Sequence, residues 1–290
     1  MNKQRTIRDT VTIEGTGLQT GKPAILRLKP SPADSGINFI RTDLPNKPLL
    51  NIQSIDASGF NANLSVRRTT LAMGPLQIQT TEHFFASLSG LSIDNIAAEL
   101  EGDELPGLDG SAKVFVEYLK KAGIVEQPVP KKTMEITSPV WCRGDDNILI
   151  ALPDDKFRVS YTLSYDFPAL GDQFFSLTVD EKNFEREIAP ARTFCLEAEA
   201  LTLIKMGLGK GANYDNTLVM GKDGPIKTAL RFPDEPVRHK ILDLIGDLCL
   251  VGMPLKAHII AIKSGHKLNI ELVKKLKEGQ GSSSQGPGKL

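Results

Sequence analysis

The first sixty residues alternate apolar and polar positions between turn-forming residues. Strand-like runs rich in β-branched residues occupy 10–18, 24–30 and 36–42. From Thr80 the apolar residues follow helical spacing, with threonines available as caps and an acid in the first turn. The pattern therefore predicts strands first, and then a helix from near Thr81 to near Gly90.

A strand over 94–102, a glycine-containing loop over 104–111 and an amphipathic helix over 112–123 complete the first half. The segment 124–133 carries two prolines and a short basic cluster, which predicts a linker and a domain boundary near residue 130. We place the domains at 1–127 and 128–280, followed by a polar tail, 281–290, that we expect to be disordered.

The second half repeats the order of the first. The pattern predicts strands over 134–142, 147–153, 156–166 and 174–179, and then a loop that leads into a helix over 191–207. These are followed by a glycine-rich loop over 207–216, a helix over 237–252, a strand over 255–265, a short loop over 264–268 and a last helix over 269–279. Because both halves run strands, helix, strand, helix, we predict an α+β protein of two similar domains packed together.

Composition narrows the class of protein. The 35 basic and 35 acidic residues cancel, so no long-range field favours nucleic acid or an anionic membrane. Cys142, Cys195 and Cys249 show no paired spacing, which argues against a disulfide framework and against a cysteine zinc finger. The N-terminus has no continuous apolar run, so we expect no secretory signal, no integral membrane segment and a cytoplasmic location.

One predicted helix carries candidate metal ligands. His239, Asp243 and Asp247 fall at i, i+4 and i+8 and therefore share one face. Imidazole nitrogen and carboxylate oxygen suit zinc, and one further protein ligand would leave a position for water. A surface histidine beside solvated acids is an equally good interpretation of this motif alone.

Residues from two other segments could join that site. Glu82 and His83 open the first helix, where a histidine ligand and a general base could sit beside one ion, although a helix-start acid beside a packed histidine is the commoner situation. His266, predicted in a loop after a strand, is a candidate acid or a loop residue without a role. His258 lies within an apolar strand and receives no function.

Several stretches in register resemble the UDP-3-O-acyl-N-acetylglucosamine deacetylase (LpxC) family over nearly the whole chain. They are GTGLQTGKPAILRLKPSPADSGINFIRTDLP, TTEHFFASLSGLSIDN, ELPGLDGSAKVF, ARTF, GLGKGANYDN, RFPDEPVRHKILDLIGDL and KSGHKLN. The resemblance implies a β-α-α-β sandwich, in which the helix layers of two domains, each a sheet with two principal helices, pack on one another.

The resemblance also implies a metal site. It assigns a zinc ion to His83, His239 and Asp243, with water as the fourth ligand. Iron(II) could occupy such a site as well. Glu82 would be the general base and His266 the general acid.

Three further residues receive supporting roles from the resemblance. Asp247 would orient His266 and keep it charged, Thr193 would support the oxyanion, and Lys240 would lie near the oxyanion and the nucleotide phosphates. An insert near 195–211 would form an apolar passage for the acyl chain, with Phe194 and two residues of the predicted helix, Leu203 and Ile204, among its lining. Ordinary helix packing would explain these apolar residues equally well.

The implied reaction is removal of acetate from UDP-3-O-acyl-N-acetylglucosamine in lipid A synthesis, by a chain that we expect to be monomeric. Gln19 stands where the family more often has histidine, and we expect the dehydratase fusion of some members to be absent. A zinc amidase for another N-acetylated sugar nucleotide is the alternative function. A non-catalytic binding protein is a third, disfavoured because every matched catalytic position is occupied.

Overall fold

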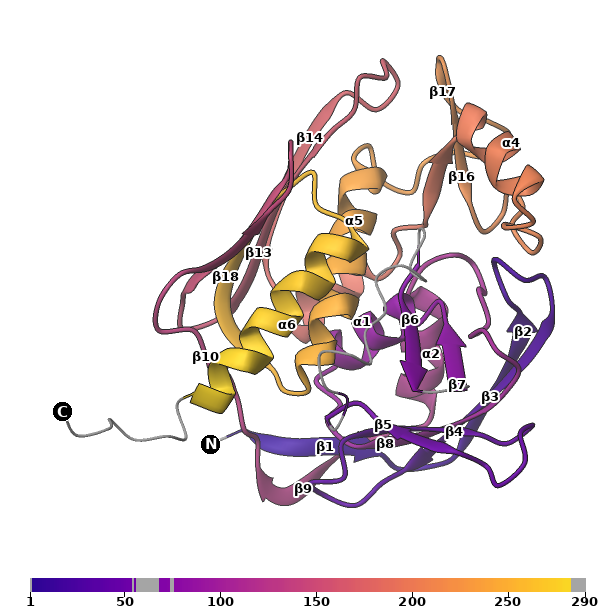
Figure 1. Cartoon of the computed structure of the whole chain (residues 1–290). Helices are drawn as coiled ribbons and strands as arrows, with labels where there is room; N and C mark the ends of the chain where they lie inside the picture. The colour runs from indigo at the N-terminus through magenta and orange to yellow at the C-terminus, as the bar shows by residue number, and fades with distance from the viewer. Residues whose placement is uncertain (1, 54, 56–67, 74–75, 283–290) are drawn as a thin grey trace.

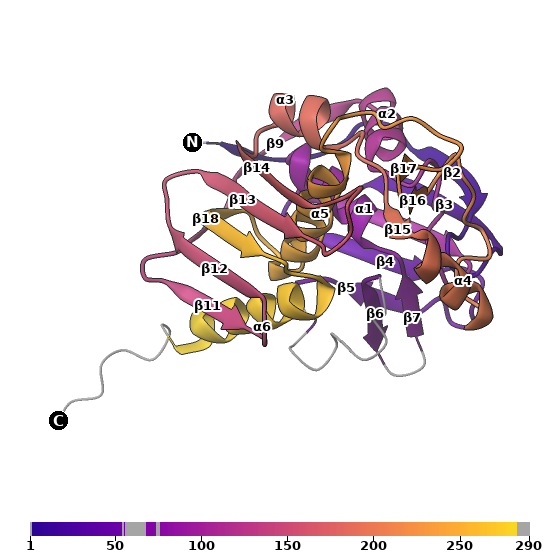
Figure 2. The same cartoon turned by 90° about the horizontal axis from the view of Figure 1, so that it is seen from above.

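Two β-sheets form the outer layers of the molecule, and helices fill the space between them (Figure 1). The computed structural model describes residues 2–53, 55, 68–73 and 76–282. The architecture is the predicted α+β sandwich of two similar units, with helix layer facing helix layer. Figure 2 shows the same layers from above, with α1 (Glu82–Gly90) and α5 (Glu235–Leu248) between the two sheets.

The first sheet belongs to the N-terminal half. Its five strands lie in the order β2 (Val11–Thr16), β3 (Pro23–Pro30), β8 (Ile96–Glu101), β4 (Ile37–Arg41) and β5 (Leu49–Asn51). Leu26 and Leu28 are fully buried, whereas Arg27 between them faces out, as the alternation predicts. The buried face packs under α1 (Glu82–Gly90) and α2 (Lys113–Lys121).

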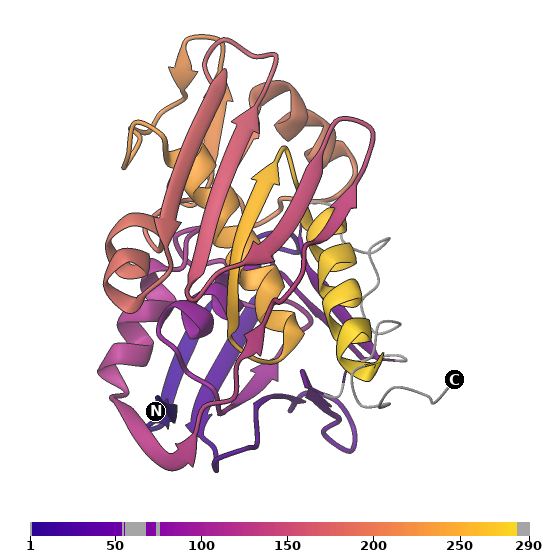
Figure 3. The ribbon, with the colours of Figure 1, turned by 90° about the vertical axis from the view of Figure 1, so that its left-hand side faces the viewer.

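The second sheet repeats this arrangement with β11 (Val140–Arg143), β12 (Ile148–Pro153), β18 (Leu255–Ile262), β13 (Phe157–Ser164) and β14 (Asp172–Thr178). The two-residue strand β10 (Met134–Glu135) pairs with β18. Figure 3 views this sheet face on. In the N-terminal unit the central strand β8 follows α1 and pairs in parallel with the earlier strand β4. In the C-terminal unit the central strand β18 follows α5 and pairs in parallel with the earlier strand β13. This correspondence supports two similar units.

The helix layer joins the two units through α1 and α5 (Glu235–Leu248), and α6 (His266–Ser282) lies beside α5. Gly246 allows the contact, because a Cβ built there would stand 2.0 Å from the carbonyl oxygen of Glu82. One continuous apolar core spans both units.

A small third sheet stands at one end, beside α4 (Glu197–Lys205) (Figure 1). It contains β15 (Phe194–Leu196), β16 (Leu218–Gly221) and β17 (Gly224–Pro225). Other described elements are the antiparallel pair β6 (Thr70–Met73) and β7 (Leu76–Gln79), the short α3 (Glu181–Asn183), the π-helical turn Phe184–Ile188 and the 3-10 turn Cys249–Val251.

Three local predictions were wrong. The expected linker forms strand β9 (Ile124–Pro130), which pairs antiparallel with β1 (Lys3–Ile7); a pair of edge strands tolerates prolines that a central strand would not. His266 is not in a loop but is the first residue of α6. The same helix includes residues 281–282 of the expected tail, and 283–290 lie outside the described residues.

The division at 127/128 falls inside β9, so we propose it only as an approximate domain boundary. Among the helices in the described part of the chain, none has both the length and the apolar character needed to cross a membrane.

Candidate metal and catalytic site

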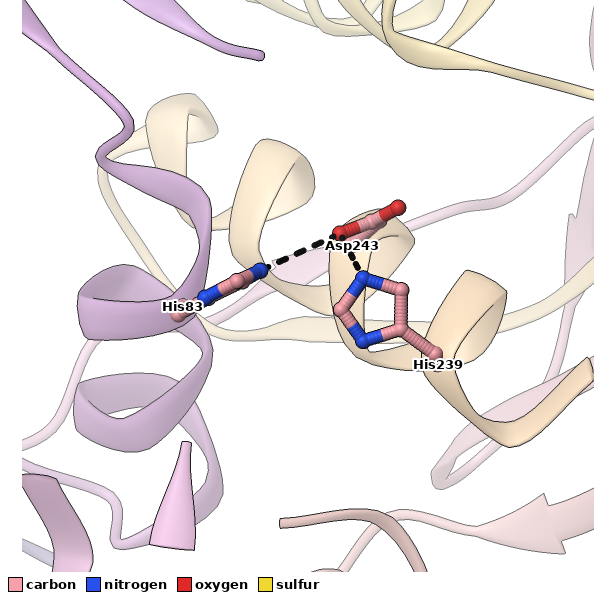
Figure 4. Close-up of side chains that lie close together, drawn as sticks. All are labelled: His83, His239 and Asp243. Carbon is pink, nitrogen blue, oxygen red and sulfur yellow. Dashed lines mark ion pairs between the residues drawn. The ribbon is translucent and has the colours of Figure 1, made fainter. Parts of the chain in front are cut away.

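Three candidate metal ligands meet where α1 and α5 cross. His83 comes from the first turn of α1, and His239 and Asp243 lie one turn apart on α5 (Figure 4). Oδ1 of Asp243 lies 3.3 Å from Nε2 of His239 and 3.8 Å from Nε2 of His83. One ligand atom from each of the three buried residues lies within 4.8 Å of the other two. The structure therefore brings together residues that are far apart in the sequence.

The protonation states of these side chains suit a cation. Burial, together with the nearby His239, lowers the pKa of His83 to about 3, so its imidazole is neutral near pH 7. Nδ1 of His239 lies 3.1 Å from the carbonyl oxygen of Ala191, which can hold a proton there and leave Nε2 for a metal. Burial raises the pKa of the Asp243 carboxyl, but His239 and Lys240 nearby outweigh it and hold the pKa well below its usual range.

This donor set fits a divalent metal. Two imidazoles and one carboxylate are ligands that zinc accepts, and three protein ligands are typical of catalytic zinc sites. The two carboxylate oxygens of Asp243 have different partners. Oδ1 lies nearest Nε2 of His83 and of His239, while Oδ2 accepts a 2.7 Å hydrogen bond from Nζ of Lys240. The structure thus contains a His/Asp site able to hold a metal ion.

Glu82 lies beside the ligand cluster as the first residue of α1. The backbone N–H of Thr69 donates a 2.9 Å hydrogen bond to its Oε2. Burial raises the pKa of the Glu82 carboxyl to about 7, against the opposing effect of His266 nearby. A carboxyl group with a pKa near neutrality can both accept and release a proton under working conditions.

His266 and Asp247 form a buried pair next to the cluster. Nδ1 of His266 lies 2.8 Å from Oδ2 of Asp247, and Nε2 lies 3.9 Å from Oδ2 of Asp243. Asn269 also donates to Oδ2 of Asp247, over 2.8 Å. Burial lowers the pKa of His266, but Asp247 and Asp243 outweigh it and raise the pKa to about 9. The imidazole therefore carries its proton at neutral pH.

Lys240 and Thr193 line a cleft together with two of the candidate metal ligands, His239 and Asp243. Burial lowers the pKa of Lys240, but the neighbouring Asp243 raises it above its ordinary value, so the ammonium remains charged. The backbone N–H of Thr193 donates to the carbonyl oxygen of Gly110 over 2.8 Å and ties the start of the third sheet to the N-terminal unit.

This cleft has a volume of about 890 Å³ and continues from the ligand cluster towards α4. Phe194, Leu203 and Ile204, the three apolar residues singled out in the sequence, all line it. Leu201 lines it too and is 61% exposed. Apolar side chains on an open wall next to polar chemistry are an arrangement that can receive a hydrocarbon chain.

Gln19 also lines the cleft, where it joins the N-terminal unit to the loop after α4. Its side-chain Oε1 accepts a 3.1 Å hydrogen bond from the backbone N–H of Gly209, and its carbonyl oxygen accepts one of the same length from Lys210. The buried carboxylate of Glu104 holds the Gln19 loop by accepting from the backbone N–H groups of Gln19 and Thr20, each at 2.8 Å. Gln19 therefore braces the loop at the end of the α4 wall.

The sequence interpretation missed two side chains of the site. Thr69 precedes β6 and touches Glu82, Asp247 and His266, while Asn269 sits one turn into α6. Neither has a local signal, since a threonine at a strand start and an asparagine in a helix are ordinary surface patterns. His258, to which no function was given, lies in β18 with Nε2 2.8 Å from Oγ of Ser160.

Comparisons with known proteins show the family of the chain. A family model described as UDP-3-O-acyl N-acetylglycosamine deacetylase matches residues 4–278. The chain is 40% identical over 279 residues to the UDP-3-O-acyl-N-acetylglucosamine deacetylase of Trichormus variabilis, covering 94% of this chain and 98% of that protein. It is 42% identical over 277 residues to the enzyme of the same name from Chlamydia pneumoniae, covering 95% and 97%. The chain belongs to the UDP-3-O-acyl-N-acetylglucosamine deacetylase family.

Proposed function

We propose that this chain hydrolyses the 2-acetamido group of UDP-3-O-acyl-N-acetylglucosamine to the free amine and acetate, in the synthesis of lipid A. The observation that carries the proposal is the convergence of three metal-ligand candidates with Glu82 and His266 in one buried cluster. Family membership supplies the substrate, because relatives that match the chain over nearly its whole length carry that name.

His83, His239 and Asp243 would hold the metal, which we propose to be zinc, with iron(II) as the other candidate. A divalent ion bound there supplies Lewis acidity to the amide carbonyl and makes water a stronger acid. The neutral state of His83 and the ionised state of Asp243 support this assignment, because both are the forms that bind a metal.

Glu82 and His266 would divide the proton transfers. Glu82 accepts a proton from the attacking water as its oxygen forms a bond to the carbonyl carbon. His266, charged at neutral pH, would then donate its proton to the nitrogen as the C–N bond breaks, so that the amine leaves neutral and acetic acid forms. Acetic acid would lose its proton to solvent to give acetate, and the proton held by Glu82 would return to His266 through solvent. Asp247 would keep His266 oriented and charged, as their 2.8 Å contact supports.

Lys240 and Thr193 would act on the oxygen of the acetamide. Both line the cleft beside the ligand cluster, and a fixed ammonium and a hydroxyl can stabilise the negative charge that develops there. The ion pair between Lys240 and Asp243 keeps the ammonium close to that position. Lys240 would also attract the phosphates of the nucleotide.

The acyl chain would lie along the wall formed by Phe194, Leu203 and Ile204. This assignment separates the proposal from an amidase for another N-acetylated sugar nucleotide. Removing the O-acyl chain should raise KM strongly if the wall binds it, whereas the alternative enzyme would be indifferent to its loss.

We also propose a monomeric, cytoplasmic enzyme. Every residue of the candidate site comes from one chain, so the chemistry needs no second copy. Balanced charge and the absence of a membrane-spanning helix among the described residues are consistent with this.

The test measures acetate release from UDP-3-O-acyl-N-acetylglucosamine by the purified protein, as isolated, after chelation, and after zinc or iron(II) is restored. We expect chelation to abolish release and one of the metals to recover it. Glu82→Gln should lower kcat by about 10²–10⁴-fold. Glu117→Gln, an exposed acid on α2, is the matched control and should leave kcat unchanged. Absence of release from folded, metal-loaded protein would refute the proposed activity.

A further inference from the structure

Thr69 occupies a position between the candidate base and the candidate acid. The residue is 1% exposed and lies just before β6, far in the sequence from α5 and α6. Its carbonyl oxygen accepts hydrogen bonds from the backbone N–H and the hydroxyl of Thr81, both at 3.4 Å, at the entry to α1. The backbone of Thr69 is thereby anchored to the helix that carries Glu82 and His83.

The polar groups of Thr69 reach both sides of the site. The backbone N–H donates to Oε2 of Glu82 over 2.9 Å. The Thr69 hydroxyl donates to Oδ1 of Asp247, and its oxygen, Oγ1 of Thr69, lies 3.2 Å from Nδ1 of His266. One residue therefore contacts the candidate base, the candidate acid and the carboxylate that pairs with the acid.

The hydroxyl completes the set of donors around Asp247. That carboxylate is fully buried. Its Oδ2 accepts a hydrogen bond from Nδ2 of Asn269 and lies hydrogen-bonded to Nδ1 of His266, each at 2.8 Å. Thr69 supplies a donor to the other oxygen, Oδ1, and so restrains rotation of the carboxylate about its Cβ–Cγ bond. Asn269 is itself held by the hydroxyl of Ser264 over 3.1 Å. A carboxylate fixed from both sides presents His266 in a single orientation.

We propose that Thr69 is a positioning residue, which aligns His266 through Asp247 with its hydroxyl and aligns Glu82 with its backbone N–H. The proposal rests on the proposed function, since it assumes that Glu82 and His266 transfer the protons. Thr69 takes no proton itself and acts through the residues that it contacts.

The substitution Thr69→Val removes the hydroxyl and keeps the shape and the backbone N–H. We expect kcat to fall by roughly 10–100-fold, the range for partners that orient groups at a metal site, with KM and metal content unchanged. Thr69→Ser keeps a hydroxyl and should restore most of kcat. Thr6→Val is the matched control, because Thr6 is also buried and accepts a hydrogen bond, from Ser31 at 3.1 Å, but lies on β1 away from the site.

A double-mutant cycle distinguishes positioning from a merely structural role. If Thr69 acts through Asp247, then Thr69→Val added to Asp247→Asn should lower kcat by less than about twofold beyond Asp247→Asn alone. A twofold change is about the error within which independent effects add, so a smaller change counts as no further loss. Full additivity of the two losses would overturn the proposal, as would a normal kcat in Thr69→Val or an equal loss in Thr69→Ser. If Thr69→Val does not fold, Thr69→Ala takes its place in the cycle.

The ring N–H resonance of His266 gives a readout that does not depend on turnover. Its low-field proton signal, assigned by its loss in His266→Ala, should shift in Thr69→Val and stay in place in Thr69→Ser and Thr6→Val. An unchanged signal in Thr69→Val would overturn the inference. Failure of the wild type to release acetate would instead refute the proposed function, while the resonance would still decide whether Thr69 positions His266.

Discussion

Replacing Gly246 by alanine tests whether the close crossing of α1 and α5 builds the metal site. A Cβ at this position would stand 2.0 Å from the carbonyl oxygen of Glu82 and 2.8 Å from its carbonyl carbon, both backbone atoms of the opposing helix. Ordinary contact begins at 3.4 Å, so the helices must separate by about 1.4 Å. This separation would lengthen the distance between two candidate metal ligands, His83 on α1 and Asp243 on α5.

The expected magnitudes follow from that shift. Overpacking costs about 1–3 kcal/mol, whereas alanine gains about 0.5–1 kcal/mol over glycine inside a helix, so we expect a net loss of free energy of unfolding. Metal sites tolerate about 0.2 Å in ligand distance, so metal affinity should fall clearly. A misplacement of about 1 Å can cost about 10²-fold in rate, and we expect a loss of that order in kcat.

The assays are urea unfolding, metal retention against a competing chelator, and acetate release. Gly279→Ala is the matched control, because the same change on α6 places a Cβ with no atom within 4 Å. It should raise stability by about 0.5–1 kcal/mol and leave metal retention unchanged. Wild-type stability together with wild-type metal retention in Gly246→Ala would refute the reasoning.

Three further predictions concern the acid, a buried ion pair and the cleft wall. Because the pKa of His266 is raised to about 9, its protonated form is lost only as pH rises through that value, so kcat/KM should fall above about pH 9. Asp247→Asn removes the charge that raises this pKa and should move the fall in kcat/KM to lower pH, whereas a fall that stays at the same pH or moves higher would contradict the assignment. Glu235→Ala leaves Arg192 buried without the carboxylate that lies 2.9 Å from its Nε, which should cost about 3–5 kcal/mol in urea unfolding; a loss under about 1 kcal/mol would be inconsistent with a buried pair. Gln19→Ala removes the hydrogen bond that braces the loop after α4, so KM should rise for a long-chain substrate and change little for one without the chain; a fall in kcat alone would argue against a bracing role.

The helices and strands of the fold were predictable because each element buries one face. The helix expected from near Thr81 to near Gly90 is α1, and the one expected over 237–252 corresponds to α5 and the turn after it. Strands such as β3 alternate buried and exposed positions with a period of two. The repeated order of elements, strands then helix, strand and helix, indicated two similar units for the same reason.

The errors arose where tertiary pairing overrides local signals. The prolines of 124–133 suggested a linker, but the segment pairs with β1, which lies at the other end of the N-terminal unit in sequence. The motif around His266 follows a serine and a glycine, which are typical of loops, and so was predicted as a loop. In the fold, the contact between His266 and Asp247 holds the first turn of α6 in place.

The sequence by itself determined the chemical types of the site and their local spacing. His239 and Asp243 had to share a helix face because they are four residues apart, and Glu82 had to adjoin His83. Only the tertiary structure decided that these pairs meet, that Thr69 connects Glu82 to Asp247, and that burial moves the pKa of Glu82 up and that of His83 down. The physical reason is that spacing along a helix is set by covalent geometry, whereas convergence and desolvation depend on how closely two helices pack, which here depends on Gly246.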